Sequence, residues 1–302
     1  MRSDGDHPTG SDPRSIATRA FRRFRDADGT NHARALAYQS TFVIISGFIG
    51  LIGLASVLDI GALRRTVVEM SKTLAPGPAR RLLEEAASQG ASGGARAMVL
   101  GLGSALIGMT FAMAQVERSG NRIAGRTEDR PTVRRYRVAA LLALTAGVAM
   151  ALGALVLAGG DSIARGFGWG DAATVWIIVR WPLGIALIGI AVYVLFRAAP
   201  EGHIASPRGL MAGAAVALVL WVAFTIGLAV YFSISTGSEQ TYGSLVAVIA
   251  LLLWAGATST ALHLGLAVAA AWEPDGAQGV VSVPDVQVAR DAERDRPSVS
   301  RR

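Results

Sequence analysis

Apolar residues are gathered into six long stretches of this chain, and charged residues are crowded between them. A run of about 20 apolar residues crosses roughly 30 Å of hydrocarbon as an α-helix. Six such runs would leave a soluble protein with almost no amphipathic helices to cover them. The pattern therefore predicts an all-α, polytopic membrane protein with six transmembrane helices. We place these spans at residues 36–58, 97–116, 138–158, 174–196, 209–232 and 244–271.

The segment that joins the first two predicted spans, residues 59–96, carries a pattern of its own. Leu63, Val67, Met70 and Leu74 recur at the spacing of an amphipathic helix, which Pro76 would end. A second short helix can follow before the glycine-rich stretch at residues 90–94. This external amphipathic loop either caps a cavity or lies on the bilayer surface, and the pattern allows both.

The two ends of the chain differ from its middle in composition. Residues 1–14 are rich in Gly, Asp, Pro and Ser, and residues 273–302 mix Pro, Asp and Arg with few aromatic residues. Neither segment can bury a core, so we expect disordered tails around a membrane domain at residues 15–272. At the start of that domain, four apolar residues fall on one helical face and arginines occupy the rest. This pattern indicates either an amphipathic helix that lies among the lipid headgroups or a simple basic flank of the first span. These apolar residues are Ile16, Ala20, Phe21 and Phe24.

Lys and Arg residues are distributed unevenly between the two sides of the predicted bundle. Of the 29, 21 lie in the two tails and in the second and fourth connections, which all fall on one side. The other side holds eight, and six of these are in the loop at residues 59–96. Because positive residues are retained in the cytoplasm, both termini are predicted to be cytoplasmic.

Small residues recur at helical spacing within two of the spans. Such stripes let helix backbones approach closely in a solvent that offers no hydrophobic force for association. We therefore expect packing seams rather than ligand sites at these positions. The stripes are Gly101, Ala105, Gly108 and Ala112 in the second span, and Gly147, Ala151, Ala154 and Ala158 in the third.

The composition also limits the chemistry of the protein. Hydrophobic residues make up 52% of the chain and charged residues 17%, so the net charge of +7 reflects membrane topology more simply than nucleic-acid binding. There is no cysteine, which excludes disulfides and thiolate metal sites. The four histidines are scattered and form no metal-binding pattern. We predict no enzymatic activity, no metal or cofactor, and no specific nucleic-acid partner.

Polar residues inside the predicted spans are candidates for function, because they are costly in hydrocarbon. Arg180 lies about one and a half turns into the fourth span beside Trp181, where it either faces a cavity or extends to the headgroups. His263 in the sixth span and Gln39 in the first lie at similar depth. They either line a polar cavity or proton path, or they are packed side chains that hydrogen-bond to neighbouring helices.

Several short motifs follow one another between Phe24 and Ala271, and their order and spacing are more specific than any one of them. They include Phe24-Arg25-Asp26, Ala33-Arg34-Ala35-Leu36-Ala37-Tyr38, Asn121-Arg122-Ile123-Ala124-Gly125, Glu128-Asp129-Arg130-Pro131, Pro200, Leu210-Met211-Ala212-Gly213 and Tyr242-Gly243-Ser244-Leu245. In this order they resemble the YihY, or BrkB-like, family of bacterial inner-membrane proteins, once labelled ribonuclease BN. The chain departs from the family pattern at Val43-Ile44-Ile45-Ser46, where Ser-x-x-Pro is usual, and at Gly265-Leu266-Ala267, where Gly-Ala-Glu is usual.

The resemblance implies a multi-pass protein of the bacterial inner membrane, in contact with membrane lipids. The sequence lacks the paired acid–base groups that RNA hydrolysis needs. The intramembrane polar groups favour a transporter or exporter of a small amphipathic or lipid-like solute, and the alternative is a non-transporting membrane factor for envelope integrity or assembly. The candidate cavity residues are Arg180, His263 and Gln39, together with Tyr38 and Tyr242 from two of the motifs.

Overall fold

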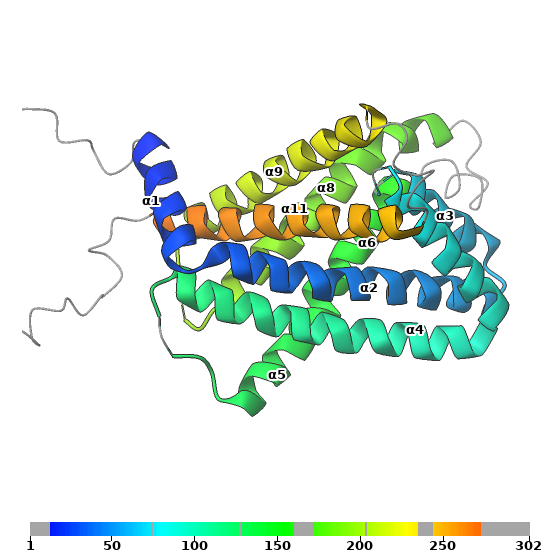
Figure 1. Cartoon of the computed structure of the whole chain (residues 1–302), viewed down its shortest axis with the longest axis horizontal. Helices are drawn as coiled ribbons and strands as arrows, with labels where there is room; N and C mark the ends of the chain where they lie inside the picture. Colours follow the sequence, from blue (N-terminus) through cyan, green and yellow to red (C-terminus); the bar gives the residue numbers. More distant parts are fainter. Residues whose placement is uncertain are drawn as a thin grey trace, which may run out of the picture.

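The computed structural model describes residues 13–73, 75, 77–126, 128–159, 172–202, 204–234 and 244–272. Within these ranges every regular element is a helix (Figure 1). The predicted tails lie outside the described residues except for Pro13 and Arg14, which already belong to the first helix. The elements are α1 Pro13–Asp26, α2 Gly29–Val57, α3 Gly61–Thr73, α4 Ala79–Ile123, α5 Thr132–Leu142, the π-helical turn η1 Ala143–Gly147, α6 Val148–Ala158, α8 Ala172–Ala198, α9 Pro207–Ile234 and α11 Ser244–Ala271.

Six helical segments are long and apolar enough to cross a membrane, which confirms the predicted all-α, multi-pass fold. They are α2, α4, the continuous α5–η1–α6 segment, α8, α9 and α11. Three of them begin well before the predicted spans: α2 at Gly29, α4 at Ala79 and α5 at Thr132. Hydropathy marks only the part of a helix that lies in hydrocarbon, whereas backbone hydrogen bonding carries the helix further into the polar region.

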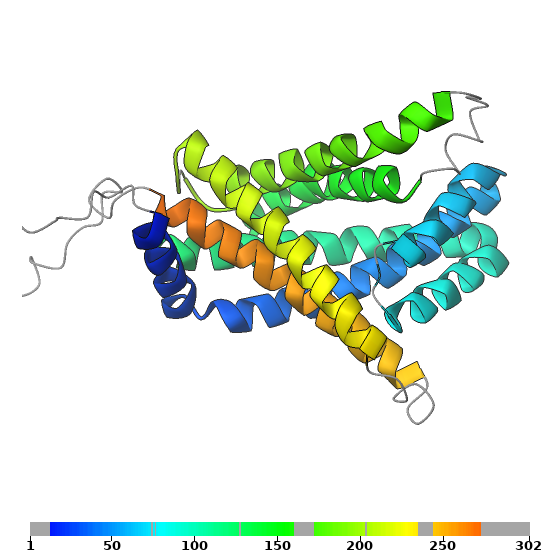
Figure 2. The same cartoon turned by 90° about the horizontal axis from the view of Figure 1, so that it is seen from above.

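The described chain starts and stops at the same end of the bundle, as Figures 1 and 2 show. The connections α4–α5 and α8–α9 lie at this end too, and we call it the arginine-rich end, after the arginines between Arg118 and Arg137. The opposite end carries α3 and the first part of α4, residues 61–93, which we call the hairpin. The cytoplasmic position of the arginine-rich end is a prediction from charge.

Three pairs of helices touch through glycine. A Cβ on Gly50 of α2 would lie 2.5 Å from the backbone nitrogen of Leu102, next to Gly101 in the predicted α4 stripe. Between α9 and α11, a Cβ on Gly213 would lie 2.5 Å from the carbonyl oxygen of Gly265. Between α6 and α8, a Cβ on Gly153 would lie 3.1 Å from the carbonyl oxygen of Gly184. These contacts bring backbones together where lipid provides no hydrophobic force, as expected for small residues.

The stripe predicted in the third span packs only in part: Gly147 lies against the Met109 side chain of α4, and Ala158 is 1% exposed. Gly147, Ala151 and Ala154 line an internal cavity, and the contact with α8 is made through Gly153 instead. The π-helical turn η1 includes Gly147 and precedes Ala151 and Ala154, and its extra residue changes the rotation of the helix that follows.

The hairpin is part of the hydrophobic core rather than a separate surface layer. Its residues Val67 and Leu83 are 0% and 1% exposed and pack in one cluster with Phe48 of α2 and Leu251 of α11. The chain bends from the hairpin into the span at Gly94, whose φ of 50° and ψ of −126° favour glycine. The loop at residues 59–96 thus caps the bundle, which was one of the two alternatives that its sequence allowed.

The predicted amphipathic helix before the first span is α1, and it is docked on the protein. Its buried face consists of Ile16, Ala20 and Phe24, whereas Phe21, expected on the same face, is 62% exposed. The guanidinium of Arg19 donates hydrogen bonds from Nε and Nη2 to the carbonyl oxygen of Ala271, at 3.3 and 3.1 Å. This carbonyl lies at the C-terminus of α11, where the helix dipole favours a cation.

Replacing Arg19 with alanine is expected to loosen α1 from the end of α11. Hydrogen bonds from a charged donor contribute about 1.5–3 kcal/mol, so amide exchange in α1 should rise by about tenfold. Hydrogen exchange of residues 13–26 in detergent measures this change. Arg22→Ala, which removes an exposed arginine of the same helix, is the control, and an equal rise in that variant would contradict the capping role.

Candidate functional site

A cavity of about 570 Å³ lies between the spans. Every span contributes to its wall, including Gly47, Met109, Ala151, Ile188, Leu218 and Leu262. Met70 and Leu83 of the hairpin close it at one end. None of the described residues that line it carries an ionisable side chain, and the few polar ones include Ser40, Thr258 and Ser259. The cavity is therefore an apolar chamber that is large enough for a small ligand, since such sites span about 300–1,000 Å³.

The cavity opens sideways between α4 and α6. Leu106 of α4 and Val148 and Leu152 of α6 all line it, yet they are 40%, 43% and 51% exposed. Figure 1 shows the reason, because the α5–α6 segment crosses α4 obliquely and moves away from it toward the hairpin end. In a bilayer this opening faces the acyl chains, so the chamber is accessible from lipid.

Four of the residues predicted to line a cavity are described, and they do not line this one. Arg180 stacks over Trp181, with 5.4 Å from its guanidinium carbon to the ring centre, and its Nε has no hydrogen-bond partner in the described structure. Gln39 has a buried Oε1 that is likewise unpartnered, and Tyr38 is 67% exposed on the outer surface. Tyr242 lies outside the described residues. A side chain's depth can be counted from sequence, but the helix face that it occupies cannot.

His263 comes nearest to the cavity. Its side chain is 1% exposed, and its Nδ1 lies 2.7 Å from the carbonyl oxygen of Ser259, which does line the cavity one turn away. Its Nε2 has no hydrogen-bond partner among the described residues. His263 and Gln39 do not hydrogen-bond to each other in the described structure, and their role in a polar cavity or proton path stays a prediction.

A buried ion pair that sequence reasoning missed lies beyond the cavity, toward the arginine-rich end. Arg130 Nη1 is 3.0 Å from Oε2 of Glu117, and the two side chains are 9% and 1% exposed. The same guanidinium donates hydrogen bonds to the carbonyl oxygens of Ala199 at 2.6 Å and Pro200 at 2.9 Å. Arg130 therefore joins α4, the α4–α5 connection and the C-terminus of α8, and we call the Glu117–Arg130 pair with these carbonyls the latch.

Asn121 extends the latch. Its Nδ2 donates a hydrogen bond to Oδ1 of Asp129 at 3.3 Å, and its Oδ1 accepts one from the backbone amide of Glu201 at 2.8 Å. The side chain of Asn121 is fully buried, so these bonds satisfy an amide that would otherwise be costly. The signal in the sequence was Glu117 itself, a carboxylate directly after the apolar run that ends at Val116.

Residues 20–281 match the model of a protein family described as Virulence factor BrkB. The chain belongs to the BrkB family. A search of curated proteins and of solved structures gives no match. The motifs that resemble this family supply part of the latch of the BrkB-family chain. Arg130 and its neighbour Asn121 come from the two loop motifs and Pro200 is a later motif residue, whereas Glu117 belongs to none of them.

The described residues of this BrkB-family chain include no group of three His, Asp or Glu side chains that could hold a metal ion. Next to the latch, Asp129 lies 3.7–4.0 Å from the guanidinium groups of Arg118, Arg122 and Arg135. The candidate functional site is thus an apolar chamber, with the hairpin at one end and an ionic latch at the other.

Proposed function

We propose that this multi-pass protein is a transporter or exporter of a small amphipathic or lipid-like solute in the bacterial inner membrane, and that it acts without catalysis. The observation that carries the proposal is the apolar chamber with an opening toward lipid. A hydrophilic solute would lose its hydration in this chamber and find no ionic partner, at a cost of several kcal/mol. An apolar chain that enters from the bilayer loses no hydration at all.

The composition of the wall supports a ligand of variable shape. Four of the seven methionines in the chain line the chamber: Met70, Met109, Met113 and Met150. Methionine is unbranched and polarizable, so a methionine-rich wall can adapt to different apolar ligands. The wall therefore fits a class of lipid-like molecules better than a single rigid substrate.

The two closed ends indicate what would have to move. Met70 and Leu83 of the hairpin cover one end, and the latch begins at Glu117, the residue after the lining residue Val116. Passage through the protein along the bundle axis would require one of these ends to separate from the spans. The sideways opening requires no such change.

Filling the chamber is expected to abolish movement of a lipid probe. Gly47 lines the chamber, and a Cβ at this position would meet no atom within 4 Å, so Gly47→Phe places a ring in the chamber without a backbone clash. The protein is reconstituted in vesicles that contain fluorescent NBD-phosphatidylglycerol, and external dithionite bleaches each probe molecule that reaches the outer leaflet. Wild-type protein should accelerate bleaching of the inner pool, and Gly47→Phe should return it to the rate of protein-free vesicles.

Gly103→Phe is the matched control, because Gly103 is exposed, has the same open surroundings and does not line the chamber. It should behave as the wild type. A wild-type rate equal to that of protein-free vesicles would count against transport of lipid-like solutes and favour the alternative, a non-transporting factor for envelope integrity or assembly. Deleting the hairpin cannot separate the two, since the hairpin belongs to the hydrophobic core.

A further inference from the structure

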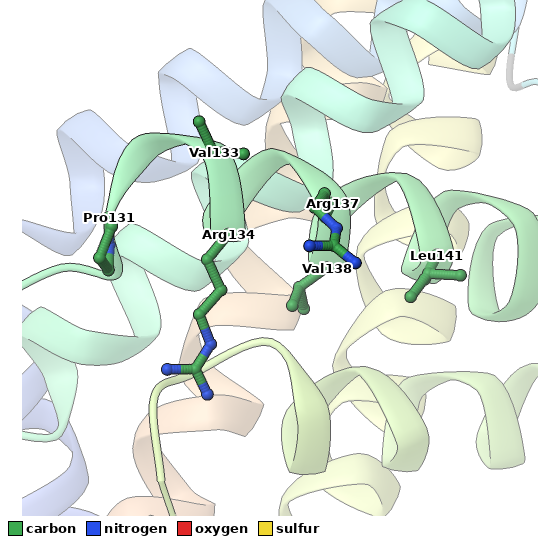
Figure 3. A pocket seen from close by; sticks show the side chains of 6 residues that line it. All are labelled: Pro131, Val133, Arg134, Arg137, Val138 and Leu141. Atoms are coloured by element: carbon green, nitrogen blue, oxygen red, sulfur yellow. The ribbon is translucent and has the colours of Figure 1, made fainter.

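The outer face of α5 carries a furrow at the arginine-rich end, with a volume of about 480 Å³ (Figure 3). All of its lining residues come from α5 or from the residue before it, so it is a surface feature rather than an interior chamber. Arg137 and Val138 lie between Arg134 and Leu141 along the helix, and Arg134 extends toward the α8–α9 connection. The lining residues are Pro131, Val133, Arg134, Arg137, Val138 and Leu141.

The two arginines of this furrow have few acidic partners within the described protein. Arg137 is exposed and has no hydrogen bond or ion pair with any described residue. Arg134 is 69% exposed and lies 3.9 Å from Glu201, an ion pair of the surface type that contributes little. By contrast, their neighbour Arg135 turns inward, is 13% exposed and pairs with Asp129. Two guanidinium groups therefore present free donors on the same side of the helix.

The furrow is apolar as well as basic. Val133 and Leu141 are 73% and 64% exposed, and Leu144 one turn deeper is 53% exposed. These side chains belong to a segment that is apolar enough to span a membrane and begins at Thr132. Arg134 and Arg137 consequently lie in the first two turns of the span, at the depth of phospholipid headgroups, with apolar side chains on the hydrocarbon side of them.

We propose that this furrow binds the headgroup of an anionic phospholipid, such as phosphatidylglycerol, in the leaflet at the arginine-rich end. The forked donors of Arg134 and Arg137 match a phosphate, which accepts their hydrogen bonds, and Val138 and Leu141 contact the first part of an acyl chain. Charge complementarity selects the anionic headgroup, and the apolar residues select a lipid over RNA, because RNA would leave them in contact with water.

This site does not rest on transport through the chamber. A lipid held here would nonetheless lie close to the sideways opening, since the exposed residues Leu141, Leu144, Val148 and Leu152 lead from the furrow to that opening. A chain without transport activity would still bind the headgroup. The experiment that follows therefore measures binding alone.

Binding is measured by native mass spectrometry of the full-length protein, released from detergent that contains equal amounts of dioleoyl phosphatidylglycerol and dioleoyl phosphatidylcholine. The wild type should retain phosphatidylglycerol in preference to phosphatidylcholine. Each guanidinium near an anionic lipid surface contributes enough to change affinity about fivefold, so Arg134→Gln with Arg137→Gln should lose most of that preference. Replacing both arginines with lysine keeps the positive charge but removes the forked guanidinium donors. This variant should show a preference for phosphatidylglycerol between those of the wild type and the glutamine variant.

The control is Arg22→Gln with Arg208→Gln, which lowers the net charge equally at the same end of the bundle and removes two exposed arginines outside the furrow. It should retain the wild-type preference. Thermal unfolding in detergent without lipid should be the same for all variants, which separates binding from folding. The proposal is overturned if the glutamine pair keeps the preference, if the control loses it equally, or if the furrow arginines are needed instead to bind an RNA oligonucleotide.

Discussion

Replacing Arg130 with alanine is expected to lower the free energy of unfolding by about 3–5 kcal/mol, because it leaves the carboxylate of Glu117 buried without its cation. Glu117 is 1% exposed, so its carboxylate is shielded from solvent and depends on the guanidinium for its counter-charge. The same substitution removes the hydrogen bonds to the carbonyl oxygens of Ala199 and Pro200. The latch is lost at three points at once, and α8 is released from the α4–α5 connection.

Unfolding in detergent, followed by circular dichroism against denaturant or temperature, measures this loss. Arg80→Ala is the control: Arg80 and Glu84 form an ion pair at 3.2 Å, but their side chains are 51% and 38% exposed, and the change should stay within about 1 kcal/mol. Replacing both Glu117 and Arg130 with methionine should recover part of the loss, since no charge is then buried. A loss in Arg130→Ala no larger than that in Arg80→Ala would show that the latch does not stabilise the fold.

Replacing Gly101 with leucine is expected to have the second large effect, because it separates α2 from α4. A Cβ at Gly101 would lie 2.6 Å from Cα of Gly50 and 2.8 Å from the carbonyl oxygen of Ser46. Both are backbone atoms, so no side chain can move aside and the helices themselves must part. Overpacking of this kind costs about 1–3 kcal/mol or more, and a full leucine side chain should reach the upper end.

Gly103→Leu tests whether the seam is responsible. Gly103 lies two residues away on the same helix, and a Cβ there would meet no atom within 4 Å. The control should unfold within about 0.5 kcal/mol of the wild type, as exposed substitutions usually do. An equal loss of unfolding free energy in the two variants would mean that leucine destabilises α4 by itself. The contact between Gly101 and Gly50 would then not be responsible.

The sequence predicts those features of the bundle that belong to a single helix and do not depend on its neighbours. Each span crosses apolar surroundings, so its composition reveals it without knowledge of its neighbours. This is why six spans and family membership were predicted correctly and are confirmed. The same reasoning placed the starts of α2, α4 and α5 poorly, since their first turns at Gly29, Ala79 and Thr132 lie outside the apolar runs.

The candidate site was less predictable, because it depends on which face each helix turns inward and on which side chains meet across helices. Depth along a span pointed to Arg180, His263 and Gln39, yet the chamber is lined by other faces of the same helices. Glu117 and Arg130 belong to separate segments, and only the fold of the α4–α5 connection brings them to 3.0 Å. In the sequence, the arginines of the inferred headgroup furrow look like any other basic flank of a span. Only the structure shows that Arg135 is directed inward and Arg137 outward.

By itself, then, the sequence determined the number of spans, the common side of the two ends, the family and the mainly apolar character of the spans. The tertiary structure alone decided that the hairpin is a cap, that Gly147, Ala151 and Ala154 line a chamber, and that this chamber opens between α4 and α6. The physical reason is that hydropathy is a property of one helix, whereas a cavity is the space that several helices fail to fill together.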